Sequence, residues 1–290
     1  MSGKFNLSHE FWKVGSINLH VVTAGEGEPV LLLHGFPEIW YSWRKVIPRL
    51  SRKYRIIAPD LRGYGQSEIP LDGYDIDTLS QDIVNLIDKI GGNATIISHD
   101  WGGVIGWHVA MTHPDKVKAL IPIAGPLLPE YFRVMLMNPL QFLKSQYVLF
   151  FQIPYLPEYL LTMGNGKLPS KLLEWSSYRP EVLSNDDMGI YRKSWSNIAS
   201  MRAGLNYYRQ LLRNAPKVLK YYSGKKIKCP VCVVWGDKDW FLSLSLTKNL
   251  EKYCDVVLEV RIIPNCGHWI QQEAPDELND IIETFMDKIK

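Results

Sequence analysis

An aspartate stands at a predicted strand-to-helix corner of the chain, where proteins often place a reactive side chain. The stretch IISHDWGGVIGW, residues 96–107, joins one short apolar run to another through Asp100 and two glycines. Corners of this kind often carry a serine nucleophile between small residues. Here the small residues are Ser98 and Gly102, with Asp100 between them. If the corner is reactive, the attacking group is a carboxylate rather than a hydroxyl.

A carboxylate at this corner favours one type of reaction. A free aspartate titrates at about 4, so Asp100 is ionised at neutral pH without the base that serine requires. It suits displacement at a saturated carbon, which leaves an alkyl ester on the enzyme. Hydrolysis of that ester needs an activated water. His268, in the segment NCGHW, can accept the proton of this water if a carboxylate fixes its tautomer.

Two aspartates of the segment WGDKDW, Asp237 and Asp239, are candidates for that orienting carboxylate. Their side-chain chemistry is the same, so the residues alone do not separate them. The aspartate that does not meet His268 is expected to accept backbone hydrogens within its own loop.

Hydrolysis of the ester also needs donors for the negative charge that develops on its carbonyl oxygen. Such donors are usually two backbone N–H groups, one from the residue after the nucleophile and one from the loop after an earlier strand. In this chain these positions are Trp101 and Phe36, the latter in the segment HGFPE. The order along the chain is then nucleophile, acid and histidine, each at the end of a predicted strand.

The elements that must position these residues alternate between strands and helices. Strands are predicted at residues 17–25, 29–35, 54–60, 94–100, 118–125, 228–236 and 257–267. Helices are predicted at residues 75–92, 102–117 and 275–290. Strands separated by helices predict an α/β fold with a mainly parallel sheet.

The strand pattern is interrupted in the middle of the chain. From about Pro126 to Tyr222 the sequence has aromatic-rich, helix-like stretches such as NIASMRAGLNYYRQLLRNA. Sheets of this class bind ligands at their carboxyl edge, and we expect the insertion to cover that edge as a lid. The sequence therefore predicts a core in two parts, 1–125 and 223–290, interrupted by a helical cap at 126–222.

Composition narrows the partners and the location. The 290 residues are 46% hydrophobic and 22% charged, with a net charge of +3 and dispersed basic residues, which argues against a nucleic-acid partner. No segment reaches the roughly 18 apolar residues of a membrane span. The first residues, MSGKFNLSHEFWK, lack the apolar stretch of a signal peptide. We therefore expect a cytoplasmic protein without a membrane span.

The four cysteines do not indicate a metal site. Cys229 and Cys232 form a C-x-x-C pair, but they lie in a predicted buried strand, where positions three apart point to opposite faces. No second pair of cysteines or histidines completes a zinc site. We expect packing thiols, and neither a metal nor a cofactor.

The chain resembles the soluble epoxide hydrolases of the α/β-hydrolase superfamily over nearly its whole length. The segments that carry the resemblance are HGFPEIWYSWR, YRIIAPDLRGYGQS, SHDWGG, WGDKD and GHWIQQEAPDE. The first four are shared by other members with an aspartate nucleophile, so they indicate the superfamily more than the reaction. The resemblance implies an α/β-hydrolase fold and hydrolysis of an epoxide to a vicinal diol through an ester on Asp100. It also implies that Asp239, the second aspartate of GDKD, is the catalytic acid.

The resemblance further implies two lid tyrosines, whose hydroxyls hold and protonate the epoxide oxygen. The segment YVLFFQIP is similar to the family segment with the first, which corresponds to Tyr147. The segment GLNYYR is similar to the family segment with the second, which corresponds to Tyr208. Tyr207 is the neighbouring alternative.

Dehalogenases are the nearest alternative, because they share the ester mechanism. Haloalkane dehalogenases typically have an asparagine after HG, where this chain has Phe36. Haloacetate dehalogenases typically follow the nucleophile with arginine, where this chain has Trp101.

A third reading is a ligand-binding protein without activity on the same fold. Such a protein would be expected to lack at least one of Asp100, Asp239 and His268, and this chain has all three. The expected partner is a small-molecule epoxide. The oligomeric state is open, and a homodimer is one candidate.

Overall fold

A computed structural model describes residues 6–290 of the chain. The predicted first part of the core begins at residue 1, and residues 1–5 lie outside the described range. The strands form a single eight-stranded sheet. They are β1 (Ser8–Val14), β2 (Ile17–Ala24), β3 (Pro29–Leu33), β4 (Arg55–Pro59), β5 (Ala94–His99), β6 (Val117–Ile123), β7 (Val231–Gly236) and β8 (Leu258–Ile263).

The strand order is β1-β2-β4-β3-β5-β6-β7-β8, and the pairs from β4 to β8 are parallel. This arrangement confirms the predicted α/β fold with a mainly parallel sheet. The pairs β1–β2 and β2–β4 are antiparallel. The sequence did not indicate β1. This strand lies at the edge of the sheet and most of its side chains are exposed or half-buried, so it has no apolar run.

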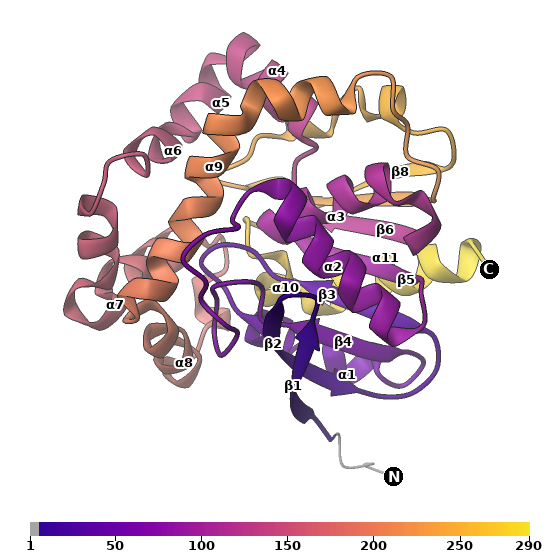
Figure 1. Ribbon diagram of the computed structural model, residues 1–290, viewed down its shortest axis with the longest axis horizontal. Coiled ribbons are helices and arrows are strands. Elements are labelled where there is room, and N and C mark those ends of the chain that lie inside the picture. Colours follow the sequence, from indigo (N-terminus) through magenta and orange to yellow (C-terminus); the bar gives the residue numbers. More distant parts are fainter. Residues whose placement is uncertain (1–5) are drawn as a thin grey trace.

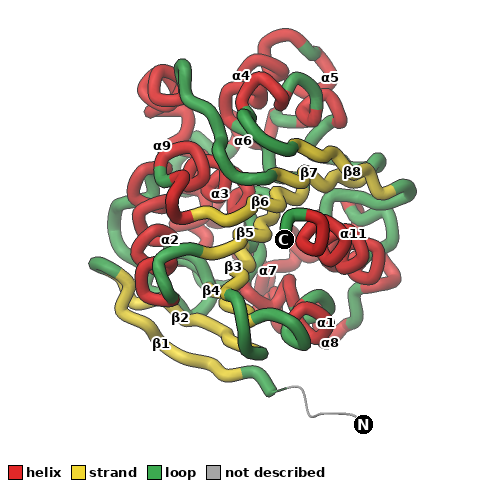
Figure 2. The backbone as a smooth tube through the Cα atoms, turned by 90° about the vertical axis from the view of Figure 1, so that its right-hand side faces the viewer, coloured by secondary structure: helices red, strands yellow, loops and turns green. Residues whose placement is uncertain are grey.

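Helices cover both faces of the sheet (Figure 2). On one face α2 (Ile76–Ile90) and α3 (Trp101–Thr112) pack against alternate strand residues such as Leu31 and Leu33. On the other face α1 (Ile47–Leu50) and α11 (Pro275–Lys288) pack against Val30 and Leu32. Strands buried on both faces explain the continuous apolar runs in the sequence.

Six α-helices lie between β6 and β7 in the chain. They are α4 (Leu128–Met137), α5 (Pro139–Lys144), α6 (Gln146–Phe150), α7 (Leu156–Ser176), α8 (Asn185–Trp195) and α9 (Ile198–Tyr222). In Figure 1 they form a layer at one end of the sheet, beside the carboxyl ends of the strands. Helix α7 is broken at 163–166, where the backbone leaves the helical region.

Short elements complete the described chain. They are α10 (Ile270–Glu273) and the 3₁₀ helices Trp40–Trp43, Pro114–Lys116, Pro180–Val182, Leu244–Thr247 and Leu250–Tyr253. Within residues 6–290, every helix is too short or too polar to cross a lipid bilayer. All four cysteines are free thiols, and Cys229 and Cys232 pack into the apolar clusters on opposite faces of the sheet.

Candidate active site

Asp100 occupies the corner between β5 and α3 in a backbone conformation that few residues adopt. Its φ is 50° and its ψ is −116°, and α3 begins at the next residue, Trp101. A positive φ outside glycine is rare and is often found at functional sites. The conformation turns the Asp100 side chain out of the sheet, toward the helices that follow β6.

Small residues next to Asp100 allow this corner to form. A Cβ atom at Gly102 would lie 2.3 Å from the carbonyl oxygen of Leu33, and one at Gly103 would lie 2.6 Å from the Cα atom of Gly125. Neither contact is sterically possible. The two glycines therefore let α3 start against the ends of the neighbouring strands.

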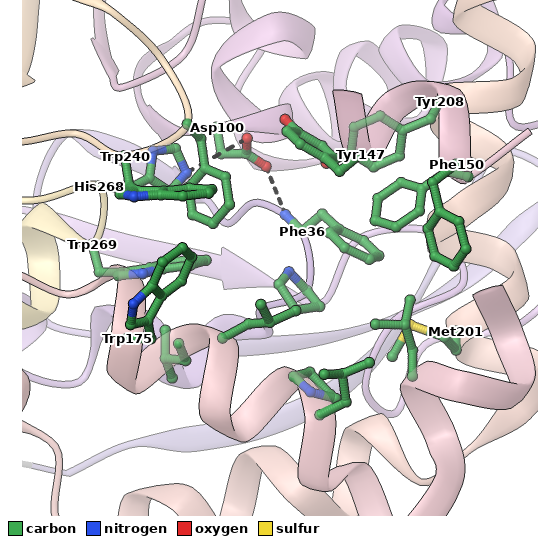
Figure 3. Close-up of a pocket in the computed structure, with 18 residues that line it drawn as sticks. Phe36, Asp100, Tyr147, Phe150, Trp175, Met201, Tyr208, Trp240, His268 and Trp269 are labelled. Carbon is green, nitrogen blue, oxygen red and sulfur yellow. Dashed lines mark hydrogen bonds and ion pairs between the residues drawn. The ribbon is translucent and has the colours of Figure 1, made fainter. Parts of the chain in front are cut away.

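The two carboxylate oxygens of Asp100 have different neighbours (Figure 3). Oδ1 accepts a hydrogen bond of 2.8 Å from the backbone N–H of Phe36. Oδ2 lies 3.7 Å from Nε2 of His268. One oxygen is thus fixed by a backbone donor, and the other faces the imidazole at a distance longer than a hydrogen bond.

His268 is oriented by Asp239. Its Nδ1 lies 2.8 Å from Oδ2 of Asp239. Because an ionised carboxylate only accepts hydrogen bonds, Nδ1 is the donor, and Nε2 is directed at Asp100. The other oxygen of Asp239 accepts from the backbone N–H groups of Phe241 at 2.8 Å and Leu242 at 2.9 Å.

The neighbouring Asp237 takes the other role expected for this loop. Its Oδ1 accepts from the backbone N–H of Cys266 at 3.3 Å, and its Oδ2 lies 3.2 Å from the Lys238 ammonium. The structure thus brings Asp239, and not Asp237, to the imidazole.

The charges around His268 control its protonation. Burial on its own lowers the pKa of this imidazole, but Asp239, followed by Asp100 and Glu38, raises the pKa to about 9. His268 therefore carries a proton near neutral pH. Loss of the Asp100 charge would lower the pKa of His268, because this charge is one of those that hold the proton.

The two backbone N–H groups predicted to stabilise the charge on the ester, those of Phe36 and Trp101, have different relations to Asp100 in this structure. The Phe36 N–H bonds to Asp100, whereas among the described hydrogen bonds none joins the Trp101 N–H to that carboxylate. Both side chains instead contact Tyr208, with ring-centroid separations of 5.3 Å for Phe36 and 5.0 Å for Trp101.

Tyr147 on α6 and Tyr208 on α9 both line the cavity that contains Asp100 and His268. Their ring centroids are 5.9 Å apart (Figure 3). Burial raises the pKa of both hydroxyls well above the usual tyrosine value, so both keep their protons. Tyr207 is turned away, because its hydroxyl donates to the backbone carbonyl of Arg62 at 2.8 Å.

Helix α9 approaches the Phe36 loop closely because residue 204 is glycine. A Cβ atom there would lie 2.8 Å from the Tyr64 hydroxyl and 2.9 Å from the Phe36 ring. Residues four apart lie on the same face of a helix. Gly204 therefore sets how near Tyr208 comes to Asp100.

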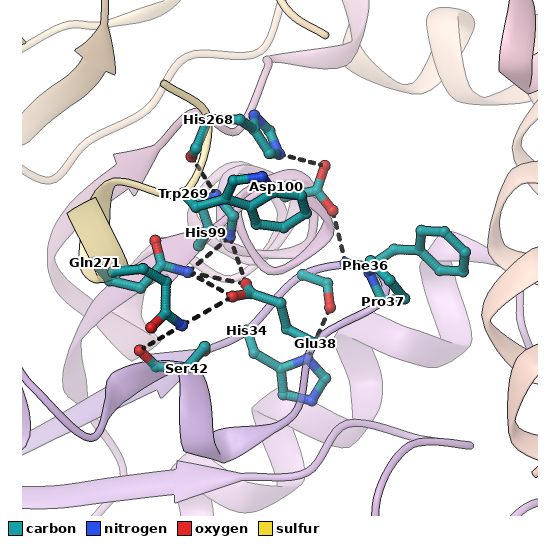
Figure 4. A network of polar contacts seen from close by, with 12 residues as sticks. His34, Phe36, Pro37, Glu38, Ser42, His99, Asp100, His268, Trp269 and Gln271 are labelled. Atoms are coloured by element: carbon teal, nitrogen blue, oxygen red, sulfur yellow. Dashed lines mark hydrogen bonds and ion pairs between the residues drawn. The ribbon is translucent and has the colours of Figure 1, made fainter. Parts of the chain in front are cut away.

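A buried polar network beneath His268 was missed from the sequence (Figure 4). Glu38 accepts from Nδ1 of His99 at 2.8 Å and from the Gln271 side chain. Nε2 of His99 lies 2.9 Å from the backbone carbonyl of His268. The network therefore supports the loop that carries the His268 imidazole. The signal was present in HGFPE and SHD, where both polar residues adjoin buried strands.

The cavity over Asp100 has a volume of about 220 Å³. Apart from Asp100, His268 and the tyrosine hydroxyls, its wall is apolar or aromatic, with side chains from the core and from the helices after β6. Within residues 6–290, no cluster of three or more histidine, cysteine, aspartate or glutamate side chains is arranged to hold a metal ion.

Comparisons with known proteins identify the family to which the chain belongs. Residues 28–275 match the family model described as alpha/beta hydrolase fold. The chain is 34% identical to "Epoxide hydrolase 4" of Homo sapiens, over 94% of this chain and 77% of that protein. It is 36% identical to "AB hydrolase superfamily protein YfhM" of Bacillus subtilis, over 96% of this chain and 97% of that protein.

Solved structures give the same result. The crystal structure of Bacillus megaterium epoxide hydrolase in complex with an inhibitor superposes with a TM-score of 0.88 and 30% identity, over 96% of this chain and 100% of that chain. The structure of epoxide hydrolase VrEH1 from Vigna radiata superposes with a TM-score of 0.85 and 32% identity, over 97% and 98% of the two chains. We conclude that the chain belongs to the α/β-hydrolase family, as a member related to epoxide hydrolases.

Proposed function

We propose that the protein hydrolyses epoxides to vicinal diols through an ester on Asp100. The observation that carries the proposal is one cavity that holds both an aspartate at the strand-to-helix corner and two protonated tyrosines, Tyr147 and Tyr208. The first is a nucleophile for a saturated carbon, and the second is a pair of neutral donors for the oxygen that leaves it. The names of the relatives in the family support the same reaction.

In the first step, Oδ2 of Asp100 attacks a ring carbon while Oδ1 stays bonded to the Phe36 N–H. A bond forms between Oδ2 and the carbon, and the bond from that carbon to the epoxide oxygen breaks. The electron pair goes to the oxygen, which takes a proton from Tyr147 or Tyr208. The proton that His268 carried then passes through solvent to this tyrosine. The transfer restores the tyrosine hydroxyl and leaves the imidazole neutral.

Alkylation removes the charge of Asp100, which is one of the negative charges that raise the pKa of His268. A larger fraction of the imidazole is therefore unprotonated near neutral pH in the ester than in the free enzyme, so it can accept a proton. It takes a proton from a water, and the hydroxide adds to the Asp100 carbonyl carbon. The negative charge on Oδ1 is stabilised by the Phe36 N–H and, in this proposal, by the Trp101 N–H.

Collapse of this intermediate breaks the bond between the carbonyl carbon and Oδ2. His268 returns its proton to the departing oxygen, which becomes a hydroxyl of the diol. The carboxylic acid left on Asp100 loses its proton to His268, which restores the starting charges. The sum is one epoxide and one water consumed and one diol formed, with Asp239 keeping the imidazole oriented.

We also propose that residues 126–222 act as a cap on a core formed by 1–125 and 223–290. Six α-helices in this segment, and cavity walls supplied partly by α6, α7 and α9, support that division.

Four free thiols suit a reducing compartment, which supports a cytoplasmic location. A homodimer is the oligomeric state that we propose, and light scattering tests it by measuring the molar mass in solution.

Product analysis tests the proposal directly. The purified chain is mixed with styrene oxide, and with 1-chlorobutane and chloroacetate as dehalogenase substrates. The proposal expects a diol from the epoxide and no chloride from either halide. Release of chloride without diol would favour a dehalogenase, and no product from any compound would favour a binding protein. The Asp100→Ala variant is the control for non-enzymatic ring opening.

A further inference from the structure

Two cavities of unequal size meet at the reacting groups. Asp100, Tyr147 and Tyr208 line both of them. The larger cavity has a volume of about 220 Å³ and the smaller has about 30 Å³. An epoxide whose oxygen lies at the tyrosines therefore has very different space on its two sides.

The larger cavity accepts a ring. A dry apolar cavity of about 150 Å³ is large enough to bind benzene. The larger cavity exceeds that volume, and its wall includes the aromatic side chains of Phe36, Phe150, Trp175 and Trp269 (Figure 3). Among residues 6–290, Asp100 and His268 are the only side chains of this wall that can carry a charge. A charged substituent would therefore find no partner there away from the reacting groups.

The smaller cavity accepts no ring. One water needs roughly 10–15 Å³ of cavity measured in this way. The smaller cavity, at about 30 Å³, therefore holds about two or three waters at most, or a group of that size. Its walls are tightly packed, because Val104, Leu128, Val148 and Leu211 are each at most 7% exposed.

We propose that the substrates are terminal epoxides. One ring carbon carries a single uncharged, ring-bearing substituent that fills the larger cavity, and the other carbon carries only hydrogens. This inference rests on the proposed function, because it concerns the substrate of the same site. A trans-epoxide with a ring on each carbon places its second ring toward the smaller cavity and is rejected.

Two substrates that differ only by one ring test the inference. The values of kcat/KM are measured for styrene oxide and for trans-stilbene oxide. A missing methylene in a pocket changes selectivity by about 10- to 200-fold, so rejection of a whole ring should reach at least about a hundredfold. We expect styrene oxide to be preferred by that factor in the natural chain.

Matched variants locate the cause of the preference. Leu211→Ala enlarges the smaller cavity, and Leu161→Ala enlarges only the larger one. The first should raise the stilbene oxide to styrene oxide ratio of kcat/KM by about tenfold or more. The second should leave that ratio almost unchanged. Circular dichroism checks folding, and Val104→Ala replaces Leu211→Ala if the latter does not fold.

The outcomes separate this inference from the proposed function. Hydrolysis of neither epoxide would overturn the proposed function itself. Hydrolysis of stilbene oxide as efficiently as styrene oxide would leave the proposed function intact and overturn the inference. The inference is also wrong if the ratio responds to Leu161→Ala and not to the variants of the smaller cavity.

Discussion

Nε2 of His268 lies 3.7 Å from Oδ2 of Asp100, the carboxylate oxygen that the Phe36 amide does not hold. The separation leaves this oxygen free of a short hydrogen bond, so it keeps its nucleophilicity. Once alkylated, the same oxygen becomes the ester oxygen, and the imidazole is already beside the carbonyl carbon that water must attack. The relationship connects the two halves of the proposed reaction, and the predictions below follow from it.

The charge of Asp100 should control the protonation of His268. Burial lowers the pKa of His268, and Asp239, Asp100 and Glu38 together raise it to about 9. Asp100→Asn removes a negative charge without changing the shape, so the pKa of His268 should fall below its natural value. NMR titration of the imidazole measures it, with Asp237→Asn as the control that leaves the pKa unchanged. A pKa that stays the same or rises in Asp100→Asn contradicts the account.

The same group should make stability depend on pH. The pKa of His268 is about 9 in the folded chain and about 6.5 in an unfolded one, so the folded state binds this proton more tightly. Its contribution to the free energy of unfolding is full below about pH 6.5 and is lost as the pH rises through about 9. Urea unfolding across this range measures the loss. A His268→Gln variant that loses as much stability over the same interval would contradict the assignment.

The two tyrosines of the cavity, Tyr147 and Tyr208, should act in ester formation. Tyr147→Phe and Tyr208→Phe each remove one donor to the developing oxyanion, which typically lowers the rate by on the order of a hundredfold or more. Hydrolysis of a preformed ester should be nearly unaffected, and single-turnover kinetics separate the two steps. Tyr207→Phe is the control. It loses a buried hydrogen bond to the Arg62 carbonyl, so it should lose about 1 kcal/mol of stability and keep its rate of alkylation. Impaired alkylation in Tyr207→Phe alone would reverse the assignment.

The two aspartates of WGDKDW should separate by the step that fails. Asp239→Asn leaves His268 without its orienting carboxylate, so the ester should accumulate and turnover should fall by on the order of a thousandfold or more. Asp237→Asn keeps an acceptor for the Cys266 amide and should remain close to the natural activity. Equal losses in both variants, measured as steady-state diol formation, would argue against a special role for Asp239.

Two glycines, Gly204 on α9 and Gly189 on α8, offer a matched test of how α9 positions Tyr208. A Cβ atom at Gly204 meets Phe36 and the Tyr64 hydroxyl, so Gly204→Ala should displace Tyr208 from Asp100. A misplacement of about 1 Å can cost on the order of a hundredfold in rate, and we expect a loss of that order. Gly189→Ala on α8 meets nothing within 4 Å and should retain activity. Full activity in Gly204→Ala would show that the close approach does not matter for the reaction.

The sequence predicted the features that are determined by short, continuous segments of the chain. The apolar strands, the corner at Asp100 and the order of the reacting residues are all recorded in short segments. Choices between neighbours were harder. Residues adjacent on a helix point about 100° apart, and only the packing of α9 decides that Tyr207 meets Arg62 and Tyr208 meets the cavity.

Features that depend on distant packing could not be predicted. The contact between Glu38 and His99 joins the loop after β3 to the last residue of β5. Each residue is a polar residue next to a buried strand, but the sequence does not show that the two meet. The two cavity volumes depend on how α6, α7 and α9 pack over the sheet. The amino-acid composition of these helices does not determine that packing. The edge strand β1 is stabilised by pairing with β2 rather than by its own apolar side chains.

The most direct test of the central claim is the intact mass of His268→Gln after mixing with styrene oxide. This variant keeps the nucleophile but lacks the base that activates water. We predict that it opens one equivalent of epoxide and gains the full mass of the substrate, which peptide mapping locates on Asp100. The double variant Asp100→Ala, His268→Gln should gain no mass. An adduct on a cysteine or another side chain, or steady diol production by Asp100→Ala, would show that Asp100 is not the nucleophile.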